Sequence, residues 1–222
     1  MTQTPGGTTL SVAFVDLAGF TALTEAHGDE DAAGLAERFV DLARGELDHG
    51  DRLVKGIGDA VMLASSGPDQ ALELVGRILE RLHVEPNFPV ARAGIHHGPV
   101  VERAGDLFGS TVNLASRVAG QAFGGQVLAT APIADAARGL GLDVVDLGGF
   151  ALRNLSDEIE LYEVHVGPPV AGGAVDPVCR MRVEREAAAG RLRHEGRDFW
   201  FCSLECVAAF ASAPERFTAS PT

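Results

Sequence analysis

VAFVDLAGFT, residues 12–21, joins an apolar stretch to a glycine-containing turn, and the expected arrangement of the first part of the chain is built around it. Together with the residues before it, the stretch TLSVAFVD (9–16) is β-branched and apolar, which predicts a buried strand. LAGFT (17–21) then opens a helix, where exposed amide groups favour phosphate and Gly19 allows a close approach. Asp16 is therefore expected beside a phosphate-binding turn.

A second segment, LVKGIGDAVMLA (53–64), predicts two strands joined by a tight, glycine-containing turn. It carries Asp59 and Lys55, the only lysine in the chain. If this hairpin pairs with the first strand, the carboxylates of Asp16 and Asp59 converge at one edge of the sheet. Such hard oxygen ligands hold Mg²⁺ or Mn²⁺ and leave coordination positions for phosphates.

The rest of residues 8–165 alternates between helical and strand patterns. This order favours the α+β class, as a ferredoxin-like α/β sandwich in which helices cover one face of a mostly antiparallel sheet. The expected helices are 21–49 with a break near Gly28, 69–83, 110–121 and 131–138, and the further strands are 89–101, 126–130, 143–149 and 159–165.

Composition and charge narrow the classes of function. The chain has 222 residues, 46% of them apolar, and a formal net charge of -13, which disfavours binding to nucleic acid phosphates. No apolar run reaches the roughly 20 residues of a membrane-spanning helix. The first residues, MTQTPGG, lack the basic region and apolar core of a signal peptide, so we expect a cytoplasmic protein without membrane contact.

The composition changes near residue 166. VGPPVAGGA (166–174) contains proline and glycine but no charge, which predicts a linker. All three cysteines and the only tryptophan follow it. We therefore expect two domains, 8–165 and 175–218.

A third segment, GDLFGSTVNLASR (105–117), adds groups suited to phosphate chemistry. Asn113 and Arg117 are four residues apart and so share one face of the predicted helix. An amide and a guanidinium together suit charge that develops on phosphorus, although such a pair also occurs on solvated helix faces. Asp106, before the helix, could accept a hydrogen bond from a base amino group.

Five segments in this order resemble the class III nucleotidyl cyclase catalytic domain over about residues 10–165. They are VAFVDLAGFT, LVKGIGDAVMLA, AGIHHGPVV, GDLFGSTVNLASR and LRNLSDEIELYEV. The resemblance implies an adenylyl cyclase that forms 3′,5′-cyclic AMP and pyrophosphate from ATP with two Mg²⁺ or Mn²⁺ ions per site. Guanylyl cyclase activity on GTP is the alternative within the enzyme class.

The resemblance also implies a role for each matching position. The metal ligands would be Asp16 and Asp59, and the purine would contact Lys55 and Asp106. Asn113 would orient the ribose, and Arg117 would stabilise the transition state. The triphosphate would contact Leu17, Ala18, Gly19, Phe20 and Thr21. Arg153 stands where many members of the family carry a lysine that meets the terminal phosphates, and it can still bind phosphate.

In this family the metal aspartates come from one subunit and the purine-reading and transition-state residues from the other. Since one chain carries all of them, the resemblance implies a head-to-tail homodimer with two equivalent sites.

The C-terminal part resembles the YHS domain, a small metal-binding module related to zinc-ribbon-like folds. The segments that carry this resemblance are DPVCRMRV (176–183) and RHEGRDFWFCSLECVAAF (193–210). Cys179, Cys202 and Cys206 offer soft thiolate ligands for zinc, copper or iron. The fourth ligand stays open between Asp176 and His194, and the alternative is three reduced cysteines in a small apolar core.

Three classes of function therefore compete. The first is an adenylyl cyclase whose activity is adjusted by metal in the C-terminal domain. The second is a catalytically silent nucleotide-binding or dimerisation module, and the third is a metal sensor or carrier that uses the cyclase fold as a scaffold.

Overall fold

The structure, a computed structural model, describes residues 8–155, 157–167 and 173–218; positions 168–172 of the predicted linker lie outside the described residues. The elements up to residue 164 are β1 (Thr8–Leu17), α1 (Phe20–His27), α2 (Asp29–Gly45), β2 (Arg52–Ile57), β3 (Ala60–Ser65), α3 (Pro68–Val84), β4 (Ala91–Arg103), β5 (Asp106–Phe108), α4 (Ser110–Gln121), β6 (Val127–Ala129), α5 (Ala131–Gly139), β7 (Val144–Phe150) and β8 (Ile159–Val164). The predicted helices and strands are confirmed, and β5 is an additional strand.

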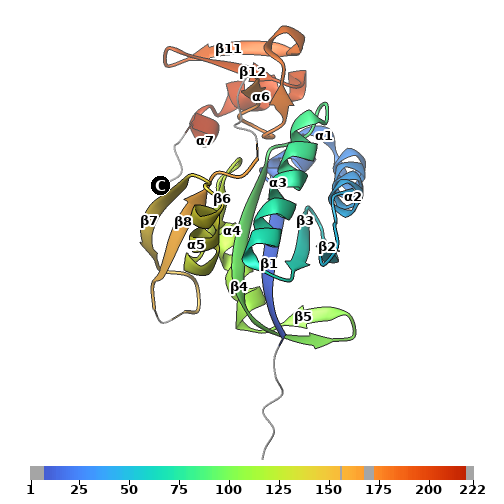
Figure 1. Cartoon of the computed structure of the whole chain (residues 1–222). Coiled ribbons are helices and arrows are strands. Elements are labelled where there is room, and N and C mark those ends of the chain that lie inside the picture. The colour runs from blue at the N-terminus through green and yellow to red at the C-terminus, as the bar shows by residue number, and fades with distance from the viewer. Residues whose placement is uncertain (1–7, 156, 168–172, 219–222) are drawn as a thin grey trace, which may run out of the picture.

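One eight-stranded sheet organises this part of the chain (Figure 1). Its order is β2-β3-β1-β4-β6-β8-β7, with β5 paired to β4 outside this path. Only the β4–β6 pair is parallel. The sheet is therefore mostly antiparallel, as predicted, and β1 lies inside it with a partner on each side.

The register of β1 fixes the position of Asp16. Its backbone lies opposite Ala60 of β3 on one side and opposite Arg92 of β4 on the other. Asp59 immediately precedes Ala60, so the turn of the β2–β3 hairpin comes next to the end of β1. The expected convergence of two aspartates at one edge of the sheet follows directly from this register.

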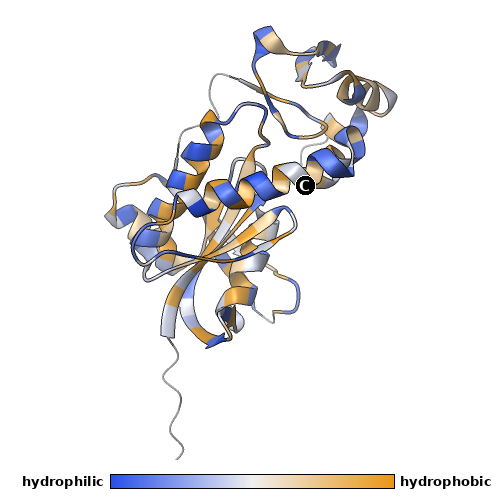
Figure 2. Ribbon diagram, turned by 90° about the vertical axis from the view of Figure 1, so that its right-hand side faces the viewer, coloured by the Kyte–Doolittle hydropathy of each residue, from blue (hydrophilic) through white to orange (hydrophobic). Residues whose placement is uncertain are grey.

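Helices cover both faces of the sheet. Val15 and Leu17 of β1 point into a core with α2, α3 and α5, whereas Val12 and Phe14 point into a second core with α4. Figure 2 shows apolar residues concentrated along the strands, and helices banded with polar and apolar residues. The prediction that helices cover only one face is therefore wrong, because the sequence pattern of α4 did not reveal which side of the sheet it occupies.

Glycines in β4 make room for α4. A Cβ atom at Gly94 would lie 2.0 Å from the backbone nitrogen of Ala119, and one at Gly98 would lie 2.6 Å from Oγ1 of Thr111. The hydroxyl of Thr111 in turn donates to the carbonyl of Pro99 at 2.7 Å. The helix thus rests directly on the strand backbone, which sets the position of Asn113 and Arg117.

Residues 173–218 form a separate C-terminal module, named here by that range. It contains β9 (Ala174–Val175), β10 (Arg182–Val183), the 3-10 helix Arg185–Ala187, β11 (Gly190–His194), β12 (Arg197–Phe201), α6 (Leu204–Ser212) and α7 (Glu215–Thr218). Two short hairpins pair β9 with β10 and β11 with β12. In Figure 1 the module lies at the end of the sheet that is remote from β5 and next to α1.

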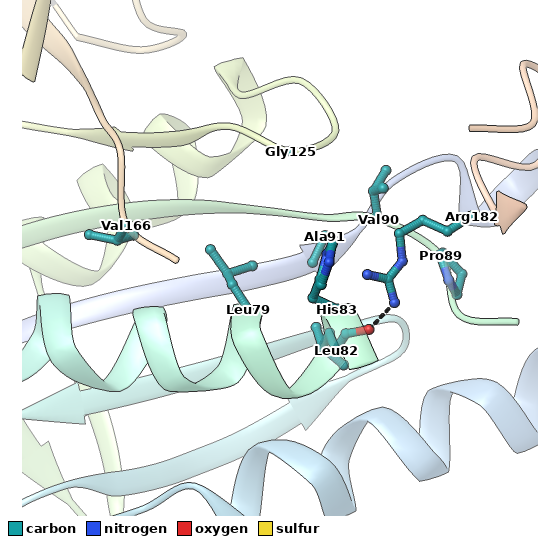
Figure 3. A pocket seen from close by; sticks show the side chains of 9 residues that line it. All are labelled: Leu79, Leu82, His83, Pro89, Val90, Ala91, Gly125, Val166 and Arg182. Carbon is teal, nitrogen blue, oxygen red and sulfur yellow. Dashed lines mark hydrogen bonds between the residues drawn. The ribbon is translucent and has the colours of Figure 1, made fainter. Parts of the chain in front are cut away.

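Backbone hydrogen bonds attach the C-terminal module to the segment before β4. Val90 donates to the carbonyl of Arg180 at 3.2 Å, and Arg182 donates to the carbonyl of Phe88 at 3.2 Å. The guanidinium of Arg182 also donates to the carbonyl of Leu82 at the end of α3 (Figure 3). A cation at this end of a helix is favourable, because the last carbonyls lack partners within the helix.

Within the described ranges, none of the helices combines the length and the apolar character that a membrane crossing requires.

We expect Gly94→Ala to destabilise the fold by about 2 kcal/mol or more, because the added methyl group overlaps backbone atoms that have no free space to move. Gly120→Ala, in the helix α4 that packs on Gly94, is the matched control, since its Cβ would meet nothing within 4 Å. Replacing a helical glycine there should be neutral or stabilising by up to about 1 kcal/mol. Urea denaturation of both variants measures this, and equal stabilities would contradict the packing described.

Candidate active site and cysteine cluster

Asp16 and Asp59 form a carboxylate pair at the end of β1. The N–H of Leu17 donates to the carbonyl of Asp59 at 3.1 Å, which ties the hairpin turn to the strand that carries Asp16. Arg92 approaches from β4, and its Nε and Nη2 atoms donate to Oδ2 of Asp16 at 2.8 and 2.5 Å. Arg92 could not be identified from the sequence, because only the β1–β4 register brings it opposite Asp16.

The electrostatics of the pair suit a divalent cation. The pKa of Asp59 is raised to about 6, first because burial disfavours its charged form and then because the negative charge of Asp16 lies close by. The two carboxylates repel each other at the C-terminal end of β1, and a cation bound between them would remove that repulsion. The arrangement therefore provides the hard oxygen ligands that Mg²⁺ and Mn²⁺ prefer.

Two of the backbone amides expected to contact a triphosphate are already engaged. The N–H of Leu17 is bonded to Asp59, and the N–H of Ala18 donates to the carbonyl of Val90 at 2.9 Å. Of residues 17–21, therefore, only those after Ala18 have backbone N–H groups that could donate to a phosphate.

The turn after Ala18 presents a helix start. Gly19 has φ of 74°, in the left-handed region that favours glycine, and α1 begins at Phe20. The first backbone bond of this helix runs from the N–H of Leu23 to the carbonyl of Gly19. The N–H groups of Phe20 and Thr21 precede that bond and are available to an anion.

Arg180 of the C-terminal module covers this turn. A Cβ atom on Gly19 would lie 2.5 Å from Cγ of Arg180, so the arginine stem packs directly on the glycine. One guanidinium nitrogen of Arg180 lies 3.5 Å from the position of a Cβ on Gly124, in the loop after α4. Burial lowers the pKa of this guanidinium. The sequence did not single out Arg180, since nothing in its pattern places the C-terminal module beside the first helix.

Lys55 and Asp106 are brought together from distant segments. The Nζ atom of Lys55 donates to Oδ2 of Asp106 at 2.6 Å, and this hydrogen bond is the main reason that the pKa of Asp106 is lowered. The additional strand β5 holds Asp106, whose backbone lies opposite Arg103 at the end of β4. A cation and an anion from two strands thus form one polar pair.

The two polar pairs are separate within one chain. Asp16 lies opposite the start of β4 and Asp106 opposite its end. Asn113 is exposed and Arg117 half-buried on α4, and neither side chain bonds to another residue of the part that the structure describes. Arg153 is exposed in the turn between β7 and β8. The structure therefore unites Asp16 with Asp59 and Lys55 with Asp106, but does not join these pairs to one another.

The three cysteines gather into one cluster at the base of the C-terminal module. The Sγ atoms of Cys179 and Cys202 are 3.3 Å apart, and those of Cys202 and Cys206 are 3.9 Å apart. Hydrogen bonds from the thiols of Cys179 and Cys202 lower the pKa of Cys206. The fourth member is His27, the last residue of α1, whose Nε2 atom lies 3.5 Å from Sγ of Cys202.

Neither of the two residues considered as a fourth ligand joins this group. Asp176 is fully buried, and its Oδ1 and Oδ2 atoms accept hydrogen bonds from the amides of Val178 and Cys202, each at 2.8 Å. His194 packs edge-on against the ring of Phe210 at 5.9 Å. The sequence could not reveal His27, because a lone histidine in another segment carries no ligand spacing.

We expect Asp59→Asn to change the pH dependence of stability of the metal-free protein. The pKa of about 6 in the folded state exceeds the ordinary 3.8, so the folded state binds more protons than the unfolded state between these values. The free energy of unfolding should therefore fall, relative to the variant, by about 1 kcal/mol as the pH rises from about 4 to about 6.5.

Urea denaturation at several pH values measures this difference. Adding Mn²⁺ near neutral pH should stabilise the unmodified protein more than the variant, because only the former keeps both carboxylates. Parallel pH profiles for the two proteins would contradict the electrostatic coupling of Asp16 and Asp59.

Comparison with known proteins agrees with both parts of the fold. A family model described as the adenylate and guanylate cyclase catalytic domain matches residues 3–166, and one described as the YHS domain matches residues 174–220. The pH-sensitive adenylate cyclase MT1302 of Mycobacterium tuberculosis is 39% identical over 176 residues, which cover 76% of this chain and 43% of that protein. An adenylate cyclase of Streptomyces coelicolor is 41% identical over 113 residues, 49% of this chain and 29% of that protein.

Solved structures show the same architecture. An adenylate cyclase of Trypanosoma brucei in its monomeric state aligns with a TM-score of 0.62 at 26% identity, over 72% of this chain and 89% of that one. The adenylyl cyclase CyaB of P. aeruginosa aligns with a TM-score of 0.60 at 23% identity, over 71% and 93% of the two chains. By contrast, the matched part of the chain spans less than half the length of the relatives from Mycobacterium tuberculosis and Streptomyces coelicolor.

Proposed function

The chain belongs to the family of adenylate and guanylate cyclase catalytic domains, and we propose that it is an adenylyl cyclase that converts ATP to 3′,5′-cyclic AMP and pyrophosphate. One observation carries this proposal: Asp16 and Asp59 lie together beside a helix start with available amides, while Lys55 and Asp106 form a pair that matches a purine edge. The names of the relatives from Mycobacterium tuberculosis and Streptomyces coelicolor point to the same activity.

Asp16 and Asp59 would hold two Mg²⁺ or Mn²⁺ ions. These ions supply charge neutralisation for the triphosphate and favour the ionised form of the attacking 3′-hydroxyl. Arg92 balances the charge of Asp16 through its paired hydrogen bonds. The amides of Phe20 and Thr21 would donate to phosphate oxygens, and the positive φ of Gly19 shapes the turn that presents them.

The remaining residues would orient the nucleotide and stabilise charge. Asn113 would bond to the ribose and so direct its 3′-hydroxyl toward the α-phosphate, while the guanidinium of Arg117 would stabilise the charge on the pentavalent phosphorus. The 3′-hydroxyl loses its proton to solvent as its oxygen bonds to the α-phosphorus. The bond between that phosphorus and the bridging oxygen of the β-phosphate breaks, so pyrophosphate leaves. Arg153, exposed after β7, would contact the terminal phosphates with a forked guanidinium.

The Lys55–Asp106 pair favours ATP over GTP. A lysine can donate to a ring nitrogen of adenine, and an aspartate can accept from its 6-amino group. Guanine offers a carbonyl at the position of that amino group, which would face the carboxylate of Asp106 without a hydrogen bond. An unpaired polar contact of this kind is costly in a site that excludes water.

A homodimer would complete the site. Among the described residues, no hydrogen bond or ion pair joins the Lys55–Asp106 pair to Asp16 or Asp59. A head-to-tail pair of chains would place the aspartates of one subunit against the purine-reading residues of the other, twice per dimer. A cytoplasmic location remains a prediction.

Turnover of nucleotides by the purified chain tests the proposed activity. With Mn²⁺ or Mg²⁺, we expect cyclic AMP from ATP, at a rate at least about tenfold above that of cyclic GMP from GTP. Asp16→Asn should reduce the rate by about 100-fold or more, because it removes a charged metal ligand. Faster turnover of GTP would assign the chain as a guanylyl cyclase, and no turnover of either nucleotide would favour a silent binding module or a metal carrier.

Mixing two inactive variants tests the shared site. Asp16→Asn and Asn113→Ala impair different halves of it, so a mixed dimer contains one intact site and one site with both changes. Random pairing of equal amounts should restore about a quarter of the unmodified activity. Gel filtration checks that both variants pair, and a mixture of paired variants without activity would contradict the shared site.

A further inference from the structure

We infer that the C-terminal module and the first domain share one zinc-type metal site, formed by Cys179, Cys202 and Cys206 of the module and by His27 at the end of α1. The ligand from α1 makes this a joint between domains and not a site of the module alone. The three thiolates bind a soft or borderline divalent cation, with Zn²⁺ as the best match to an S₃N set.

The distances fit a tetrahedral centre. With Zn–S bonds of about 2.3 Å and Zn–N bonds of about 2.0–2.1 Å, such a centre has S–S edges of about 3.8 Å and S–N edges of about 3.6 Å. The S–S distances are 3.3 Å between Cys179 and Cys202 and 3.9 Å between Cys202 and Cys206. Nε2 of His27 lies 3.5 and 3.9 Å from Sγ of Cys202 and Cys206. All four ligand atoms lie within 4.8 Å of one another.

A buried carboxylate holds two of the ligands in place. Asp176 accepts hydrogen bonds from the amides of Cys179 and Cys202 at 3.4 and 2.8 Å, so it bridges the two backbone segments that carry these thiols. Supporting bonds of this kind fix ligand geometry in structural metal sites. A core filled by three reduced cysteines would need neither this bridge nor an imidazole nitrogen aimed at the sulfurs.

The cluster is also reachable from solvent. A groove of about 570 Å³ is lined by His27 and Cys202 and, beside them, by the acidic residues Glu30 and Asp31 of α2. Cys179 and Cys206 are fully buried, whereas Cys202 is partly exposed on this groove. A cation can therefore enter past two carboxylates and meet the thiols behind them.

The position of His27 gives the joint a mechanical consequence. The same short helix, α1, starts at the phosphate-binding turn and ends at His27. On the other side, Cys179 directly precedes Arg180, whose stem packs on Gly19 of that turn. A bound metal would therefore clamp both ends of α1, through His27 at one end and through Arg180 at the other.

An apolar contact also holds the C-terminal module against α1 and α2, and a bound metal would add to its stability. Leu23 of α1 and Ala32 of α2 share one buried cluster with Val178, Phe201 and Phe210 of the module. A module of this size has a small core, and small domains commonly depend on a metal for stability. Metal removal should loosen the module from α1 even where the backbone bonds to the segment before β4 persist.

Metal content of the full chain tests the inference. After loading with Zn²⁺ and removal of excess metal, we expect one zinc ion per chain. His27→Ala should weaken zinc affinity by at least about 100-fold, because it deletes a ligand. The matched control is His49→Ala, since His49 is an exposed histidine of the same domain outside the cluster. Zinc bound equally tightly by His27→Ala would overturn the proposal, as would an unmodified chain that binds no zinc and forms a disulfide from two of its cysteines.

The spectrum of Co²⁺ in the same site provides a second test. It does not require the alanine variant, which could fold poorly. The unmodified chain should show the thiolate charge-transfer and intense d–d bands of a tetrahedral centre. His27→Cys should keep one metal ion per chain and strengthen the charge-transfer band, because a fourth thiolate replaces the imidazole. A Co²⁺ spectrum unchanged by His27→Cys would show that residue 27 does not bind the metal and would overturn the inference.

Hydrogen exchange distinguishes a joint between domains from a site that is merely adjacent. Removal of zinc should increase amide exchange in α1 and in residues 176–182 together, while exchange in β1 and β4 stays unchanged. The measurement needs no nucleotide turnover, so it stands whether or not the chain proves to be a cyclase. Unchanged exchange of α1 on zinc removal would overturn the clamp.

Discussion

The closeness of the carboxylates of Asp16 and Asp59 is the feature on which the proposed activity rests. It arises because β1 runs inside the sheet, with the β2–β3 turn on one side and Arg92 of β4 on the other. Arg92 offsets the negative charge of Asp16, whereas burial and then the nearby charge of Asp16 raise the pKa of Asp59. The two carboxylates thus offer hard oxygen ligands for a divalent cation beside the start of α1.

The C-terminal module lies on the same turn, which distinguishes this chain from a cyclase domain alone. Its residues 180–182 bond to the backbone before β4, its core includes Leu23 of α1, and its cysteines face His27. Every one of these contacts reaches an element next to the aspartate pair. One short helix, α1, thus connects the carboxylates at the end of β1 with the thiols of the module.

The sequence predicted the strands, the helices and the pairing of Asp16 with Asp59, because alternation and glycine turns are local signals. It could not predict contacts that depend on register or on docking. Arg92 meets Asp16 across 76 positions, and His27 meets Cys202 across 175. The prediction that all helices cover one face of the sheet was also wrong, since the apolar face of α4 could pack on either side. The contact that places α4 is with the backbone of β4 at Gly94, where there is no side chain.

A crystal structure of the chain with Mn²⁺ and a non-hydrolysable ATP analogue would show directly where the metal and the nucleotide bind. Anomalous scattering locates manganese independently of the nucleotide. The account predicts manganese between Asp16 and Asp59, and the adenine ring beside Lys55 and Asp106 of the partner subunit. Manganese absent from the aspartate pair, or a nucleotide held entirely within one chain, would contradict it.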